Sequence, residues 1–296
     1  MKRIPHPVVD DAAILGRVAG RMPVAGCPHI EDDTQIVRDR YDAYIAANAN
    51  PFLPNCPQPL LMAGLLQNAL SERYGRESEY LQPIENLRNN RALNICPMCG
   101  LPGTGTLDHI FPRRHYPELA IFSHNLVPTC WRCNTKHQAN HRGADDGQRL
   151  FHPYFDDSLN NRLVRATIQA NPDFGVPDIE LESCLQDNDP LNNTVVFHID
   201  TVLRPAGVLD DLFVFWADLR RFPRKELSSL PRGEFEDAEF NAAVINALVD
   251  ADQWHTTPNN YKSMLFEGLR VNAAASNYLA QWIRNLDADP DLAQDV

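Results

Sequence analysis

The chain has 296 residues, of which 44% are hydrophobic and 22% are charged, a composition that argues against wholesale disorder. Its net charge of −12 argues against a protein that coats nucleic acid by bulk electrostatics. Seven cysteines, an odd number, fit a disulfide framework poorly.

The start of the chain does not resemble a secretion signal. It is basic for two residues only, and Asp10, Asp11 and Arg17 interrupt any apolar run before it reaches the length of a signal peptide. No stretch approaches the roughly 20 apolar residues of a membrane span. We therefore expect a cytoplasmic protein that does not contact a membrane.

The N-terminal region, residues 1–90, is predicted to be mostly helical. Its first 30 residues are punctuated by Pro and Gly, which is typical of a loosely packed arm. A helix is expected from Thr34 to about Ala49, where apolar side chains follow a helical stripe. Further helices are predicted at about 60–73 and 77–91.

Two pairs of thiols follow, Cys96 with Cys99 in CPMCG and Cys130 with Cys133 in CWRC. Two such pairs supply the four ligands of a tetrahedral zinc site; the alternative is four reduced thiols without a metal. Four cysteines leave no open coordination position, so we expect this zinc to be structural. The long gap between the pairs predicts a substructure of its own.

The segment around the thiol pairs is basic, unlike the rest of the chain. Residues 91–142 contain six Lys or Arg and two acidic residues, a balance of +4, so the remainder carries −16. Five of the ten histidines also lie in this segment. It could face a polyanion while the rest of the protein keeps the chain soluble.

Between the thiol pairs we predict a strand that ends at Asp108 and His109, a returning strand that starts at Asn125, and a helix that begins on the second pair. This order, in CPMCG…LDHIFP…HNLVPTCWRCNTKH, resembles the HNH endonucleases of the ββα-metal fold. The resemblance implies that His109 is the general base and that Asn125 orients its imidazole through hydrogen bonding. It also implies that Asp108 and Asn134 hold a catalytic divalent ion.

The chemistry of these side chains agrees with the roles that the resemblance implies. An imidazole such as that of His109 can take a proton from water near neutral pH. Asp108 is expected on the opposite side of its strand, where it can bind a cation without blocking the base. One charged and one neutral oxygen ligand favour Mg²⁺ or Mn²⁺.

The sequence departs from the resemblance at one place. Relatives often carry Lys three residues after the second metal ligand, whereas here Lys136 is two residues after Asn134 and His137 is three. His137 is nearly one helical turn from Asn134, so it could bind the metal or contact phosphate. We expect Asn134 to be the ligand and His137 to be auxiliary.

Other residues near the motif are candidates for supporting roles. Four cations are expected to contact nucleic acid: Arg113, Arg114, Arg132 and Lys136. The segment FHPYFDD, residues 151–157, resembles one that follows the motif in some bacterial relatives, including proteins encoded in phage-defence loci. Its His152 and Tyr154 either buttress the active site or pack this turn against the module.

The C-terminal region, residues 146–296, is expected to contain strands and then helices. β-Branched residues predict strands at 162–170, 178–184 and 194–203, and helices are expected at 210–221, about 234–249, and 259–284. The predicted fold class is therefore α+β: a largely helical protein with a central zinc-stapled ββα-metal module at 91–145.

The expected function is a metal-dependent endonuclease that hydrolyses phosphodiester bonds in DNA, with RNA not excluded. Two alternatives stay open. One is a zinc-stabilised module that binds nucleic acid or protein without catalysis. The other is an effector subunit of a bacterial defence complex that is held inactive until a protein partner, such as an ATPase, releases it.

Overall fold

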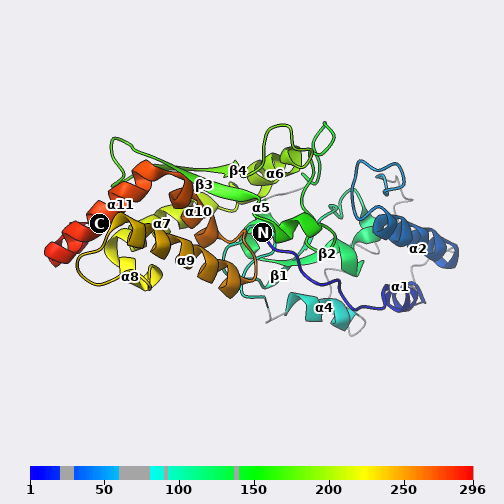
Figure 1. Cartoon of the computed structure of the whole chain (residues 1–296). Coiled ribbons are helices and arrows are strands. Elements are labelled where there is room, and N and C mark those ends of the chain that lie inside the picture. The colour runs from blue at the N-terminus through cyan, green and yellow to red at the C-terminus, as the bar shows by residue number, and fades with distance from the viewer. Residues whose placement is uncertain (21–29, 60–80, 90–92, 137–139, 296) are drawn as a thin grey trace. The chain divides into compact units, whose positions relative to one another are not determined.

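The computed structural model describes residues 1–20, 30–59, 81–89, 93–136 and 140–295. The chain forms two compact units, drawn in Figure 1. The N-terminal unit comprises Arg3–Met98 and Pro102–Asp157, and the C-terminal unit comprises Met1–Lys2, Cys99–Leu101 and Ser158–Val296. The predicted division into three regions at residues 90 and 145 stays a prediction.

A small hairpin followed by a helix forms the centre of the N-terminal unit. Its elements are β1 (Thr106–His109), β2 (Leu126–Thr129) and α5 (Trp131–Lys136). The strands are antiparallel, and their register places Asp108 opposite Val127 and His109 opposite Leu126. The loop between them contains two short helical turns, η2 (Pro117–Leu119) and η3 (Ser123–Asn125). The expected strand, strand, helix order is confirmed.

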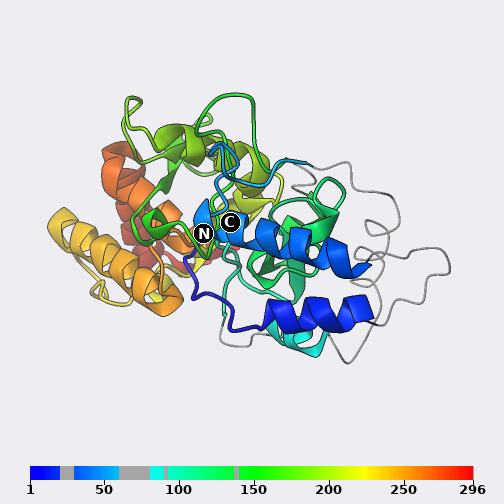
Figure 2. The same ribbon diagram turned by 90° about the vertical axis from the view of Figure 1, so that its right-hand side faces the viewer.

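Longer helices accompany the hairpin in the described part of this unit. They are α1 (Asp11–Gly20), α2 (Ile30–Ala46) and α4 (Gln82–Arg88). α1 and α2 lie side by side (Figure 2). α2 buries Val37, Tyr41 and Tyr44, which share one face because residues three and four apart are neighbours on a helix.

The prediction of a loosely packed arm is wrong for residues 11–20, which form α1. The Asp10 carboxylate accepts a hydrogen bond from the Ala13 amide at 2.9 Å and so begins the helix. Ile14, Leu15 and Val18 are buried on one face of it. The N-cap and the helical spacing of the buried residues stabilise a helix here, despite the Pro and Gly residues nearby in the sequence. The helix expected at 60–73 lies outside the described residues.

In the C-terminal unit a second antiparallel hairpin, β3 (Val164–Gln169) with β4 (Asp178–Ser183), packs on helix α10 (Tyr261–Val271). Alternate side chains of β3 are buried, which is the pattern of a sheet with one covered face. Gly268 of α10 allows the close approach, because a Cβ there would lie 2.3 Å from the carbonyl oxygen of Ala166. The strands expected at 162–170 and 178–184 are confirmed.

Most of the remaining C-terminal unit is helical, which confirms the α+β class. The helices are α6 (Asn192–His198), α7 (Val208–Arg221), α8 (Pro223–Glu226), α9 (Asp237–His255) and α11 (Ala273–Ala288). Shorter turns are η4 (Asp157–Asn160), the π-helical η5 (Ile199–Leu203) and η6 (Pro290–Asp295). In the part of the chain that the structure describes, no helix is both long and apolar enough to cross a membrane.

The strand predicted at 194–203 is wrong, because these residues form α6 and η5. The segment is rich in β-branched residues, which favoured a strand. Its buried apolar residues, however, are Val195, Ile199, Val202 and Leu203, at intervals of four, three and one. That spacing is helical, and the packing of one helical face outweighs the intrinsic preference of valine and threonine.

The single helix predicted at 259–284 is two helices, α10 and α11, separated by Asn272. The Asn272 side chain accepts a hydrogen bond from the Ala275 amide at 3.1 Å and caps α11. Its amide nitrogen also donates to the Ile168 carbonyl of β3 at 2.6 Å. Asn272 therefore marks the boundary between the two helices, although the apolar periodicity continues across it.

Candidate active site and metal centre

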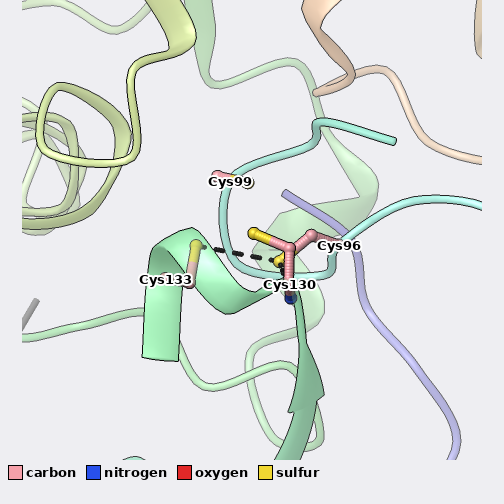
Figure 3. Close-up of side chains that lie close together, drawn as sticks. All are labelled: Cys96, Cys99, Cys130 and Cys133. Atoms are coloured by element: carbon pink, nitrogen blue, oxygen red, sulfur yellow. Dashed lines mark hydrogen bonds between the residues drawn. The ribbon is translucent and has the colours of Figure 1, made fainter. Parts of the chain in front are cut away.

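The four cysteines of the two thiol pairs lie together. Their Sγ atoms are all within 4.8 Å of one another, and all four residues are buried. Figure 3 shows Cys130 at the end of β2 and Cys133 on α5, beside the turn that carries Cys96 and Cys99. The predicted pairs thus form a possible zinc site.

The spacing of the sulfurs suits a metal better than a disulfide. The Sγ atoms of Cys96 and Cys133, joined by the dashed line in Figure 3, are 3.8 Å apart. Sulfurs about 2.3 Å from a tetrahedral zinc ion lie about 3.8 Å from one another, whereas a disulfide needs about 2.05 Å. The backbone amide of Cys130 also points at the Cys96 sulfur, at 3.4 Å, which favours a thiolate.

A cavity of about 520 Å³ opens beside β1 and α5 in the N-terminal unit. It is lined by Arg88, Gly105, Thr106, Leu107, Asp108, His109, Pro112, Arg113, Arg114 and Asn134. Five residues that the sequence predicts for the active site therefore meet in one cavity, although they come from the strand, the loop and the helix. The loop follows the His109 end of β1 and α5 follows the Thr129 end of β2, opposite Thr106, and α5 packs against β1.

The hydrogen bond of His109 fixes which ring nitrogen carries its proton. Nε2 lies 3.0 Å from the carbonyl oxygen of Ala120. A carbonyl only accepts, so Nε2 carries the hydrogen and donates it. In the neutral ring the proton acceptor is then Nδ1. The imidazole therefore has the tautomer that a base needs, held by the backbone of the β1–β2 loop.

Asp108 and Asn134 contribute oxygen donors to the same cavity. Asp108 is 5% exposed, and Asn134 is an exposed residue of α5 directly after Cys133. A carboxylate and a neutral amide oxygen are hard ligands, which suit a small divalent cation. The donor set of the cavity thus fits the catalytic ion that the sequence predicts.

Asn125 is fully buried, and all the hydrogen-bonding positions of its side-chain amide are occupied by groups other than His109. Its Oδ1 accepts from the Phe111 amide at 2.7 Å and from the Tyr44 hydroxyl at 3.1 Å. Its Nδ2 donates to the carbonyls of Phe111 at 3.0 Å and Leu119 at 3.2 Å. These four bonds fill the amide's capacity. Asn125 therefore pins the β1–β2 loop, and its link to His109 runs through that loop, not through a direct bond.

The basic residues divide into two groups. Arg113 and Arg114 are exposed and line the cavity, as does Arg88 of α4, which the sequence analysis missed. Arg88 precedes the basic segment by three residues, and its guanidinium pairs with Glu85 at 2.9 Å. Arg132 and Lys136 lie on α5 but are not part of the cavity lining. His137 lies outside the described residues.

The FHPYFDD segment packs against the hairpin. The Tyr154 hydroxyl donates to the Leu126 carbonyl of β2 at 2.9 Å. His152 is buried, and its Nε2 lies 3.0 Å from the Tyr44 hydroxyl of α2. Burial holds the pKa of His152 well below its usual value, so this imidazole is neutral at neutral pH.

The hairpin, the helix and the cysteine cluster define a class of protein. Residues 96–140 match the family model described as HNH endonuclease. This segment contains both thiol pairs, β1, β2 and α5. The chain therefore carries an HNH endonuclease domain.

A curated relative is similar over a somewhat longer stretch. The chain is 38% identical over 65 residues to "Protein ea31" of Escherichia phage lambda. The match covers 22% of this chain and 22% of the relative's length, so it concerns a fraction of each protein. No solved structure matches the chain.

Proposed function

We propose that this protein is a metal-dependent endonuclease that hydrolyses phosphodiester bonds in DNA. The observation that carries the proposal is the single cavity lined by Asp108, His109, Asn134 and three arginines. A base, hard oxygen ligands and cations are the parts that phosphodiester hydrolysis needs, and all of these residues except Arg88 lie within the HNH endonuclease domain.

Each group in the cavity has a role in this proposal. Nδ1 of His109 takes the proton from the attacking water, while the Ala120 carbonyl holds the ring. Asp108 and Asn134 would hold Mg²⁺ or Mn²⁺, which when bound supplies positive charge at the phosphate and leaving oxygen. Arg88, Arg113 and Arg114 hold neighbouring phosphates of the substrate.

The cysteine cluster has a structural role in the same proposal. The four thiolates would hold a zinc ion with no open position, so that this ion would take no part in the chemistry. When bound it would fix the start of α5, and with it Asn134, relative to the end of β2.

The direct test is the cleavage of a supercoiled plasmid with Mg²⁺, with Mn²⁺ and with EDTA. The wild-type protein should nick or cut the plasmid only with a divalent ion. His109→Ala should lower the rate by about 10²–10⁴-fold, the usual contribution of a general base. Its affinity for the plasmid should change little, because the base acts on water.

His115→Ala is the matched control, since His115 is an exposed histidine in the same loop. It should cut like the wild type. Full activity of His109→Ala would overturn the assignment of the base. Binding of DNA without cleavage under any metal condition would instead favour the non-catalytic binding module. Control by a protein partner, such as an ATPase in a defence complex, stays a prediction.

A further inference from the structure

A buried chain of hydrogen bonds leads from the FHPYFDD segment to Asn125. The Tyr154 amide donates to Nδ1 of His152 at 3.2 Å. Nε2 of His152 lies 3.0 Å from the Tyr44 hydroxyl, which donates to Oδ1 of Asn125 at 3.1 Å. His152, Tyr44 and Asn125 are at most 1% exposed, so their side chains are shielded from bulk solvent.

The Tyr154 amide, which can only donate, assigns the donors and acceptors of this chain; the His152 ring also bonds the backbone of His124. Nδ1 of His152 accepts from a backbone amide, and the neutral ring therefore carries its hydrogen on Nε2. Nε2 then donates to the Tyr44 oxygen, which leaves the Tyr44 hydrogen for Asn125. Every bond of the chain runs in one direction, from residue 154 towards residue 125.

The chain continues to His109 through two neighbouring peptide groups. Nδ2 of Asn125 donates to the carbonyl of Leu119, and Nε2 of His109 donates to the carbonyl of the next residue, Ala120. A displacement of the Asn125 amide therefore moves the loop segment that holds the imidazole. Rotation of that carbonyl would free Nε2 and let the ring exchange tautomers.

We propose that Tyr44, oriented by His152, is a positioning residue that keeps His109 in its Nε2–H tautomer. The proposal rests on the proposed function, in which His109 is the base. Tyr44 acts through Asn125 and the β1–β2 loop, without contact with the substrate. It lies on α2, well before the segment that matches the HNH model.

Tyr41 is a comparison position that distinguishes a hydrogen-bonding role of Tyr44 from a packing role. It lies one turn earlier on α2 and stacks on Phe122 of the same loop, with the ring centroids 4.0 Å apart. Its hydroxyl is buried and has no hydrogen-bond partner among the described residues. Tyr44 packs on the same Phe122, at 5.5 Å, but its hydroxyl is bonded on both sides. The two tyrosines thus share a helix and a loop, and only one is bonded to Asn125.

The experiment compares Tyr44→Phe with Tyr41→Phe in two measurements. The first is plasmid cleavage, where Tyr44→Phe should lower kcat about tenfold and leave KM for DNA within about twofold, on the scale of one buried hydrogen bond. The second is the ¹⁵N spectrum of the His109 imidazole without DNA, assigned with His109→Ala. Tyr44→Phe should mix the two tautomers, whereas Tyr41→Phe should match the wild type in both measurements.

Two variants of His152 test the orientation of Tyr44 separately. His152→Gln places an amide near Nε2 and can still donate to Tyr44, whereas His152→Asn is shorter and reaches only the position of Nδ1. Glutamine should preserve the His109 spectrum, and asparagine should disturb it. This pair keeps the proposal testable if Tyr44→Phe fails to fold.

The two readouts separate this proposal from the proposed function. A wild-type protein that never cleaves DNA would end the proposed function, yet the imidazole spectrum would still report whether Tyr44 holds His109. A wild-type spectrum in both Tyr44→Phe and His152→Asn would overturn the positioning role. So would equal changes in Tyr44→Phe and Tyr41→Phe, because they would indicate packing alone.

Discussion

At the scale of single residues, Asn134 is the side chain whose role depends most on its place in the chain. It follows Cys133 directly, so the cysteine cluster sets where its amide enters the cavity. His137 competes with it for the role of second ligand in the sequence, but lies outside the described residues. The two candidates differ in chemistry, since an amide oxygen is a hard ligand and an imidazole is a softer one.

We expect Asn134→Ala to raise the Mg²⁺ concentration needed for half-maximal cleavage at least about tenfold, because a residue that binds the ion directly should matter no less than residues that only bond to its ligands. Thr135→Ala is the control, since Thr135 is an exposed neighbour on α5 that does not line the cavity. His137→Ala should mainly weaken binding in a salt-dependent way. Selective loss of activity with Mn²⁺, Co²⁺ or Ni²⁺ in His137→Ala would show instead that the imidazole is the ligand.

At the scale of elements, the hairpin and α5 are too short to be stable alone. Each strand has four residues and α5 has six, below the lengths at which isolated hairpins and helices persist. Contacts from α1 and α2 hold the connecting loop: Arg40 donates to Glu118 at 2.7 Å, and Asp11 accepts from the Ser123 amide at 2.9 Å. The cysteine cluster holds the other end.

Removal of one cysteine should therefore unfold the module before it changes the chemistry. Structural zinc contributes about 10–16 kcal/mol in small zinc domains, as much as the whole stability of a typical protein. Cys130→Ser should lower zinc content and solubility together, measured by metal analysis and circular dichroism. Cys184→Ser, which removes a thiol of the C-terminal unit, should keep the zinc. Wild-type protein purified without stoichiometric zinc would count against a structural zinc site in the cysteine cluster.

At the scale of the whole molecule, buried neutral histidines make stability depend on pH. Burial lowers the pKa of His152 in the N-terminal unit and of His255 in the C-terminal unit, where Lys262 lowers it further. Above about pH 6.5 the ring is neutral in the folded and the unfolded chain alike. Below about pH 6.5 the imidazole is protonated in the unfolded chain but stays neutral in the folded chain. The free energy of unfolding therefore falls as the pH decreases towards the lowered pKa of the folded state.

His152→Gln should remove part of this dependence, because glutamine does not titrate. The expected observation is a loss of amide hydrogen-exchange protection at residues 149–156 of the wild type between about pH 6.5 and 5, and a smaller loss in the variant. Acid release of zinc affects both proteins equally and cancels in the comparison. An identical pH dependence of the two would show that His152 contributes nothing to it.

The sequence predicts the parts of the site that are local in the chain. Both thiol pairs, the strand with Asp108 and His109, and the start of α5 follow from spacing, because turn and hairpin geometry act over a few residues. Tyr44 could not be assigned in this way. In the sequence it is one of several apolar residues at helical spacing, which predicts a core position. Its hydrogen-bond partners Asn125 and His152 are 81 and 108 residues further along the chain.

The misassigned elements have the same cause. Residues 194–203 favour a strand by composition and become helical because one face packs in the core. Arg88 belongs to a helix that looks merely amphipathic, and only the fold brings its end to the cavity. Short-range preferences are weak terms, and tertiary packing overrides them where a long-range contact is available.

The one-way chain through Tyr44 also constrains how related sequences can change. Loss of the tyrosine hydroxyl removes one hydrogen bond of the buried His152 imidazole, which also bonds the His124 backbone, at a cost of about 0.5–1.5 kcal/mol. Loss of the histidine leaves the tyrosine oxygen unsatisfied in turn. We therefore expect residues 44 and 152, which no local motif connects, to be replaced together in related sequences.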